Sequence, residues 1–107
     1  MVEEKLVALA KQCQDDSERW FAENNNIIHH SLGMAGEVGE FCNLVKKIDR
    51  GSLDIRTPQV RYDLAMELTD VFIYLLNLAG MMHIDLEKTY MIKRGENEKR
   101  FGGKASA

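Results

Sequence analysis

The sequence predicts an all-α protein, an antiparallel four-helix bundle. Apolar residues recur every three or four positions through four segments, which is the spacing of one face of a helix. No segment shows the apolar–polar alternation of a strand. The connections between the segments are short, which favours antiparallel neighbours.

The length of the chain and its charge restrict the class of protein. At 107 residues, with 45% hydrophobic and 29% charged residues, the chain fits one folded domain, expected over residues 1–101 with a flexible tail at 102–107. A net charge of −3 gives no basic face for duplex nucleic acid. Burial per residue is modest at this size, so self-association would add stability.

The first two helices are predicted at 2–23 and 27–49. The run of three asparagines at 24–26 ends the first helix, and Asn26 is a good N-cap for the second. Gly51 is well placed to stop the second helix, since glycine readily takes the left-handed conformation found after a helix end.

The third helix is predicted from Pro58 to about Met82, with Thr57 as N-cap and proline at the first helical position. It carries two stripes at helical spacing. The apolar stripe is Leu64, Leu68, Val71, Leu75, Leu78 and Met82, and the polar stripe is Asp63, Glu67, Asp70, Tyr74 and Asn77.

The fourth helix is predicted from a cap at Asp85 to about Arg100, although Gly95 weakens its later turns. The two cysteines, Cys13 and Cys42, form no CxxC pattern and are expected to be reduced and inert. No signal peptide is evident, and the run 71–84 is too short to cross a bilayer, so a cytoplasmic location is expected.

Two acidic motifs are the main candidates for a functional site. The pairs Glu37/Glu40 and Glu67/Asp70 each place two carboxylates three residues apart, on one face of a helix. Such a pair on a single helix is usually a solvated face. Two pairs on different helices are what a bundle uses to build an internal metal site. The first pair is also flanked by three glycines, Gly33, Gly36 and Gly39, which a merely solvated helix would not need.

The ligand types restrict the metal. A di-iron bundle would use Glu-x-x-His pairs, but positions 43 and 73 are Asn43 and Ile73. With oxygen ligands alone we expect a hard cation, Mg²⁺ with Mn²⁺ as a substitute. Such a site suits the binding of phosphate oxygens and hydrolysis by an activated water.

These residues resemble the MazG-like all-α nucleoside triphosphate pyrophosphohydrolases. The resemblance lies in GEVGE at 36–40, ELTD at 67–70, the 26 residues at 41–66 between them, and a K-x-x-x-N-x-x-R-F stretch at 93–101. It spans roughly residues 15–101 and points to single-domain, dCTP pyrophosphatase-type members. It implies Mg²⁺-dependent hydrolysis of (deoxy)nucleoside triphosphates to the monophosphate and pyrophosphate, in nucleotide-pool house-cleaning.

The resemblance also implies roles for particular residues. The four carboxylates would bind magnesium, one of them serving as a base, and the substrate would be held by Lys93, Asn97, Arg100 and Lys47. It further implies assembly as a dimer or a dimer of dimers, with a pocket lined by more than one subunit. The substrate would be a nucleotide, with no nucleic-acid polymer and no membrane as partner.

Base recognition is left open by the sequence. Trp20 could stack on a base, as aromatic residues of this region do in the resembling enzymes, but packing in a core or interface is the stronger interpretation for it and for Phe21. His29 and His30 are expected to be solvent-facing or hydrogen-bonded in the core. Asp63 and Asn77 are candidates to support the metal ligands.

Two alternatives stay open. One is a non-catalytic helical oligomerisation or regulatory module in which the acidic cluster holds a structural ion. The other is a phosphoribosyl-ATP or dUTP hydrolase of the same superfamily.

Overall fold

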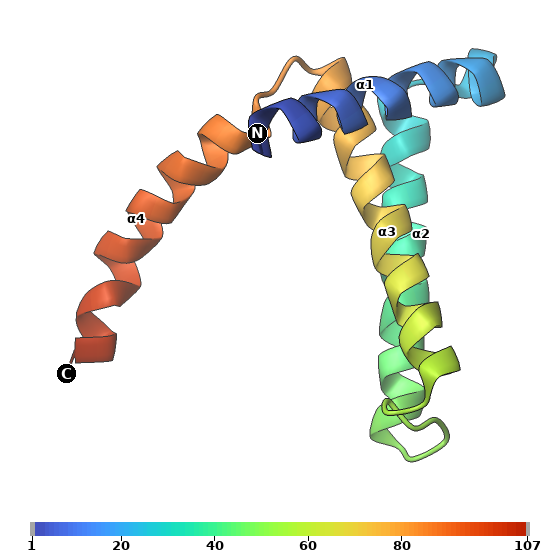
Figure 1. The fold of residues 1–107 in the computed structure, drawn as a ribbon, viewed down its shortest axis with the longest axis vertical. Coiled ribbons are helices and arrows are strands. Elements are labelled where there is room, and N and C mark those ends of the chain that lie inside the picture. The colour runs from blue at the N-terminus through green and yellow to red at the C-terminus, as the bar shows by residue number, and fades with distance from the viewer. Residues whose placement is uncertain (1, 107) are drawn as a thin grey trace.

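The computed structural model describes residues 2–106, and within this range it contains helices and no strand (Figure 1). Four α-helices follow one another, with a short 3-10 helix, η1, after the first. The helices are α1 (Val2–Phe21), η1 (Ala22–Asn24), α2 (Ile27–Asp49), α3 (Pro58–Met81) and α4 (Leu86–Ser106). The all-α prediction is therefore confirmed.

The helix ends follow the local sequence. Asn26 caps α2, its side chain accepting a hydrogen bond from the His29 amide at 2.8 Å. Gly51 ends α2 at φ +83°, with its amide bonded to the Ile48 carbonyl. Asp85 accepts from the Lys88 amide at 3.1 Å and so caps α4. Thr57 occupies the N-cap of α3, but its side chain makes no capping hydrogen bond.

Two boundaries differ from the sequence prediction. The α1 helix ends at Phe21, and the following turn tightens into η1 instead of continuing to residue 23. The α4 helix continues past Arg100 to Ser106, through most of the segment predicted as a tail. Glycines at 95, 102 and 103 lower helix propensity without forbidding the conformation, and no proline interrupts the segment. Residue 107 lies outside the described residues.

The helices form an open arrangement. Figure 1 shows α2 and α3 side by side as an antiparallel hairpin, α1 crossing the end of that hairpin, and α4 leading away from it. The radius of gyration is 17.1 Å, against about 13 Å for a compact domain of this length. A single chain therefore does not close into the predicted four-helix bundle, because α4 does not pack along the hairpin.

The core of one chain is small and lies where α1 crosses α3. Among the residues whose burial is described, the buried apolar ones are Val60 and, near the end of α3, Leu76, Leu78 and Ala79. Three polar residues, Ser17, His30 and Asn77, are buried with them. The close approach is seen at Gly80, where a methyl group would collide with the side chain of Gln14 on α1.

The two stripes of α3 take unexpected positions. The polar stripe contains half-buried Glu67, Asp70 and Tyr74, whereas Leu68 of the apolar stripe is 53% exposed and Leu75 is also exposed. By length and composition α3 could span a membrane, alone among the described helices, although only 22% of its most apolar window is buried. Exposed apolar faces are typical of surfaces that contact a partner, a ligand or a membrane.

Candidate metal centre

The acidic cluster forms at mid-length of the α2–α3 hairpin. One carboxylate oxygen from each of Glu37, Glu67 and Asp70 lies within 4.8 Å of the other two. Glu67 and Asp70 are successive-turn neighbours on α3, and Glu37 comes from α2. All three side chains are half-buried. The two acidic motifs therefore meet across the hairpin, as the sequence predicted.

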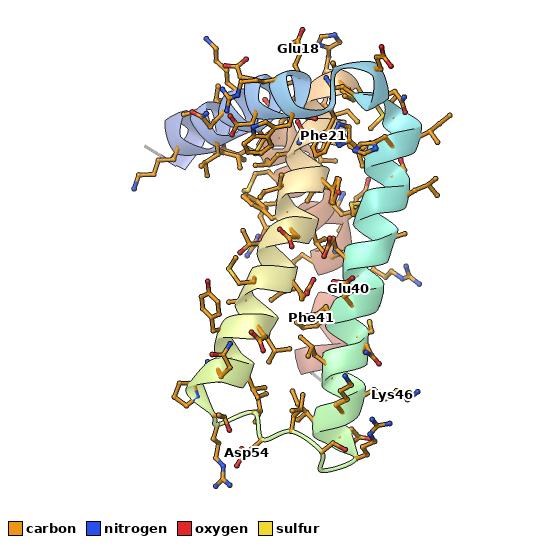
Figure 2. The ribbon with its side chains drawn as sticks, turned by 90° about the vertical axis from the view of Figure 1, so that its right-hand side faces the viewer. Glu18, Phe21, Glu40, Phe41, Lys46 and Asp54 are labelled. Carbon is orange, nitrogen blue, oxygen red and sulfur yellow. The ribbon has the colours of Figure 1, made fainter. Side chains whose placement is uncertain are left out.

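Glu40 lies beside this group. Its ligand atoms fall outside the group of three, and its side chain is exposed. Figure 2 shows Glu40 midway along the hairpin, well removed from Asp54 in the loop and from Phe21 at the α1 end. It interacts with Glu67, so it belongs to the same cluster from the solvent side.

The carboxylates disturb one another's ionisation. The pKa of Glu40 is raised, chiefly by the negative charge of Glu67 and then by a hydrogen bond between the two side chains. The pKa of Glu67 is also raised, first by a side-chain hydrogen bond with Glu37 and then by burial. Such a hydrogen bond requires a proton between the two carboxyl groups. The cluster therefore favours added positive charge, from protons or from a cation.

The donor set fits a hard divalent cation. Oε2 of Glu37 and Oε2 of Glu67 are buried without a hydrogen-bond partner. Unpartnered buried carboxylate oxygens are unfavourable unless a cation or a donor reaches them. The cluster contains oxygen ligands only, the type that Mg²⁺ and Mn²⁺ prefer.

The predicted substrate-binding residues lie apart from the cluster within one chain. Lys47 is half-buried, two turns beyond Glu40 toward the loop. Lys93, Asn97 and Arg100 are exposed on α4, which diverges from the hairpin (Figure 1). A single chain therefore does not bring these α4 side chains to the carboxylates.

Trp20 is also outside the cluster and outside the core. It is 64% exposed, packs edge-on against Phe21, and has the Arg19 guanidinium over its ring at 5.5 Å. Trp20 is therefore not packed in the core of the described chain. Phe21 is 40% exposed and contacts the ring of His29.

Sequence reasoning missed a buried polar network between α1 and α2. Nε2 of His30 lies 2.8 Å from Oδ1 of Asn25 and 3.1 Å from Oγ of Ser17, and the Ser17 hydroxyl donates to the same Asn25 oxygen at 2.8 Å. His30 is thus hydrogen-bonded in the core, one of its two expected states. Ser17 and Asn25 carried no sequence signal, because their roles depend on the way α1 crosses the end of the α2–α3 hairpin.

The two supporting candidates on α3 have local partners. Asp63 accepts a hydrogen bond from the Gln59 side chain at 2.8 Å, one turn before Glu67. Asn77 is buried and donates to the Ile73 carbonyl at 3.1 Å, two turns beyond Asp70. Neither side chain has a hydrogen bond to the four carboxylates among the described interactions.

Comparison with known proteins gives distant relatives. The chain is 36% identical to dCTP pyrophosphatase 1 of Rattus norvegicus and 33% identical to that of Bos taurus, each over 72 residues. These alignments cover 65% of the chain but only 42% and 43% of the two relatives. A 54-residue match to the Gene 37 protein of Mycobacterium phage L5 is 41% identical and covers 50% of the chain and 47% of that protein.

The comparisons agree with the resemblance to dCTP pyrophosphatase-type enzymes, and the relationship that they give is distant. The chain spans less than half the length of the curated relatives it matches. Comparison with profiles of known protein families gives no match. This helical protein, with an acidic cluster between two of its helices, is therefore a distant relative of dCTP pyrophosphatase 1.

Proposed function

We propose that this protein is a metal-dependent nucleoside triphosphate pyrophosphohydrolase. The observation that carries the proposal is the meeting of Glu37, Glu67 and Asp70 within 4.8 Å, in a chain 36% identical over 72 residues to dCTP pyrophosphatase 1. The reaction converts a (deoxy)nucleoside triphosphate into its monophosphate and pyrophosphate. Removal of surplus or non-standard nucleotides in the cytoplasm is the corresponding role.

The carboxylates provide both binding and proton transfer in this proposal. A bound Mg²⁺, with Mn²⁺ as a substitute, would neutralise the triphosphate and join its oxygens to Glu37, Glu67 and Asp70. Glu40, which lies outside the group of three, accepts the proton of the attacking water. The water oxygen bonds to the α-phosphorus, the bond to the α–β bridging oxygen breaks, and pyrophosphate leaves.

The active species in this proposal is a homodimer or homotetramer. The exposed apolar face of α3 and the splayed α4 leave a groove of about 770 Å³ lined by residues such as Leu6, Phe72, Leu75 and Tyr90. Packing of a second copy there would bury this surface and complete a helical bundle. It would also allow the α4 of one subunit to bring Lys93, Asn97 and Arg100 to the carboxylates of another.

Sedimentation analysis of the wild type and of Phe72→Glu tests the assembly. Phe72 is 40% exposed and lines the groove, so an added charge there should shift the protein toward monomer. A monomeric wild type at micromolar concentration would rule out the assembly. Trp20, near the end of α1, is exposed and is proposed to stack on the base, so Trp20→Ala should raise KM more than it lowers kcat.

The activity is tested with a panel of ribo- and deoxyribonucleoside triphosphates in the presence of Mg²⁺. Pyrophosphate should be released, and release should be lost in Glu40→Gln and Asp70→Asn. Asp49→Asn is a matched control, since Asp49 is an exposed acid at the far end of α2. Release of orthophosphate alone would contradict cleavage between the α and β phosphates.

The same panel, extended with phosphoribosyl-ATP, separates the alternatives. Preference for dUTP or phosphoribosyl-ATP would assign the protein to those branches of the superfamily. An increase of melting temperature with Mg²⁺ but no turnover of any nucleotide would identify a structural ion site in a non-catalytic module.

A further inference from the structure

One aromatic ring of α3 rests directly on the backbone of α2. A methyl group at Gly33 would lie 2.5 Å from Cζ of Tyr74, 2.6 Å from Cε1 and 2.8 Å from the hydroxyl oxygen. Atoms at these separations overlap, so a side chain at Gly33 would require either the Tyr74 ring or one of the two helices to move. The outer part of the Tyr74 ring thus lies directly against the backbone of α2 at this level.

The neighbouring glycines do not share this requirement. A methyl group at Gly36 or at Gly39 would meet no atom within 4 Å. Glycine inside a helix is less favourable than alanine. Gly33 makes a close contact with Tyr74 that Gly36 and Gly39 do not make. Gly36 and Gly39 therefore serve as matched controls for Gly33.

The Tyr74 ring is enclosed on the side toward α1. Its centroid lies 6.4 Å from that of His29 and 5.8 Å from that of His30. His30 is 1% exposed and is fixed by its contacts with Asn25 and Ser17. His29 and His30 lie on α2 itself and fill the space on the α1 side of Tyr74, so they hinder the ring from turning in that direction, and we expect a side chain added at Gly33 to press the two helices apart.

The contact lies one turn from the acidic cluster on both helices. Gly33 precedes Glu37 by four residues, and Tyr74 follows Asp70 by four, so both carboxylates are about 6 Å along the axis from the contact. Metal–oxygen distances tolerate deviations of only about 0.2 Å. A change in helix separation at Gly33 therefore reaches the carboxylates at a scale that metal binding detects.

We infer that the Gly33–Tyr74 contact sets the separation of α2 and α3 at the carboxylates, which makes these two residues positioning residues for the metal centre. The inference rests on the proposed function only in taking the cluster to be a metal site. Tyr74 and Gly33 touch neither carboxylates nor metal in this role. They act through the spacing of the helices that carry the ligands.

The test compares Gly33→Ala with Gly36→Ala by two measurements. The first is Mn²⁺ affinity, followed by the paramagnetic resonance of free Mn²⁺. The second is the metal-free distance between spin labels on cysteines at the exposed positions Val38 and Leu68, with Cys13 and Cys42 changed to serine and labelled chains diluted with unlabelled ones. Circular dichroism confirms that each variant is folded.

Gly33→Ala should lengthen the label distance and weaken Mn²⁺ binding on the order of tenfold, as loss of a residue supporting a metal ligand does. Gly36→Ala should leave both unchanged. Adding Tyr74→Ala to Gly33→Ala removes the collision and should reverse the lengthening of the label distance, while the Mn²⁺ affinity should stay below that of the wild type because the Tyr74 ring is gone. A purely structural role would lower stability without such a rescue.

Several results would overturn the inference. An unchanged label distance in Gly33→Ala would do so, as would failure of Tyr74→Ala to restore it. Both results would be decisive whether or not the protein binds metal, since the distance between the spin labels is measured in the absence of metal. A protein that binds Mn²⁺ and shows the rescue but cleaves no nucleotide would refute the proposed activity and leave the positioning role standing.

Discussion

Replacing His30 with alanine tests the buried junction between α1 and α2. His30 is 1% exposed, and its Nε2 contacts Asn25 and Ser17 at 2.8 and 3.1 Å. The variant removes both contacts and leaves a cavity where the ring was. Ser17 and Asn25 stay bonded to each other at 2.8 Å, so the change strands neither of them.

The expected loss of stability is about 2 kcal/mol. Because the Ser17 hydroxyl donates to Asn25, the one Nε2 proton is shared between the two oxygens, and this hydrogen bond contributes about 1 kcal/mol, with about 2 kcal/mol more from the cavity. Against this stands a gain of about 1 kcal/mol, because Nδ1 of His30 is buried without a partner and its desolvation is relieved. Packing and hydrogen bonding therefore outweigh the unpartnered nitrogen.

Urea denaturation followed by circular dichroism, at one fixed protein concentration, measures this loss. His83→Asn is the control, since His83 is exposed and its φ of +54° is one that asparagine tolerates. The control should stay within about 0.5 kcal/mol of the wild type. A loss below about 1 kcal/mol in His30→Ala would refute the view that this network holds α1 on the hairpin.

Three further predictions concern pH, charge and backbone conformation. Burial, and then the neighbouring His29, lower the pKa of His30. The unfolded chain therefore takes up the proton first, and the free energy of unfolding should fall as the pH drops below about 6.5. Measuring the free energy of unfolding against pH should show a smaller dependence in His30→Asn. The pKa of Glu40 is raised by the charge of Glu67, so without divalent metal Glu40→Gln should raise the melting temperature at pH 7. This increase should fade toward pH 4, because the carboxylates are then protonated in the wild type as well. An increase that persisted at pH 4 would exclude charge repulsion as its cause. Gly51→Ala should cost about 1–2 kcal/mol in urea denaturation because Gly51 has φ +83°, and an unchanged midpoint would show that the turn rearranges freely.

The helices and the acidic pairs were predictable because both depend on local spacing. Asn26, Gly51 and Asp85 act within four residues of their own positions, so their capping roles could be inferred directly from the chain. The three-residue spacing in each acidic motif likewise places both carboxylates on one side of a helix. That the two motifs would meet required only the antiparallel pairing of α2 and α3.

The positions that depend on contacts between helices could not be predicted in this way. Ser17 and Asn25 lie in a run of polar residues that looks solvent-exposed in the sequence. They are half-buried or buried only because α1 crosses the end of the hairpin. Of the three glycines near the acidic motif, Gly33 alone faces an aromatic ring, and local spacing does not distinguish it from the other two.

By itself the sequence determined the helical class and most helix ends, and it predicted four carboxylates for the candidate site, of which the structure groups Glu37, Glu67 and Asp70. The tertiary structure decided which face of α3 meets α2, where α4 points, and which side chains join α1 to the hairpin. The reason is that periodicity marks an apolar face as one to be buried but does not name the surface that buries it. In this chain the polar stripe of α3 contributes Glu67, Asp70 and Tyr74 to the contact with α2, while Leu68 and Leu75 remain exposed.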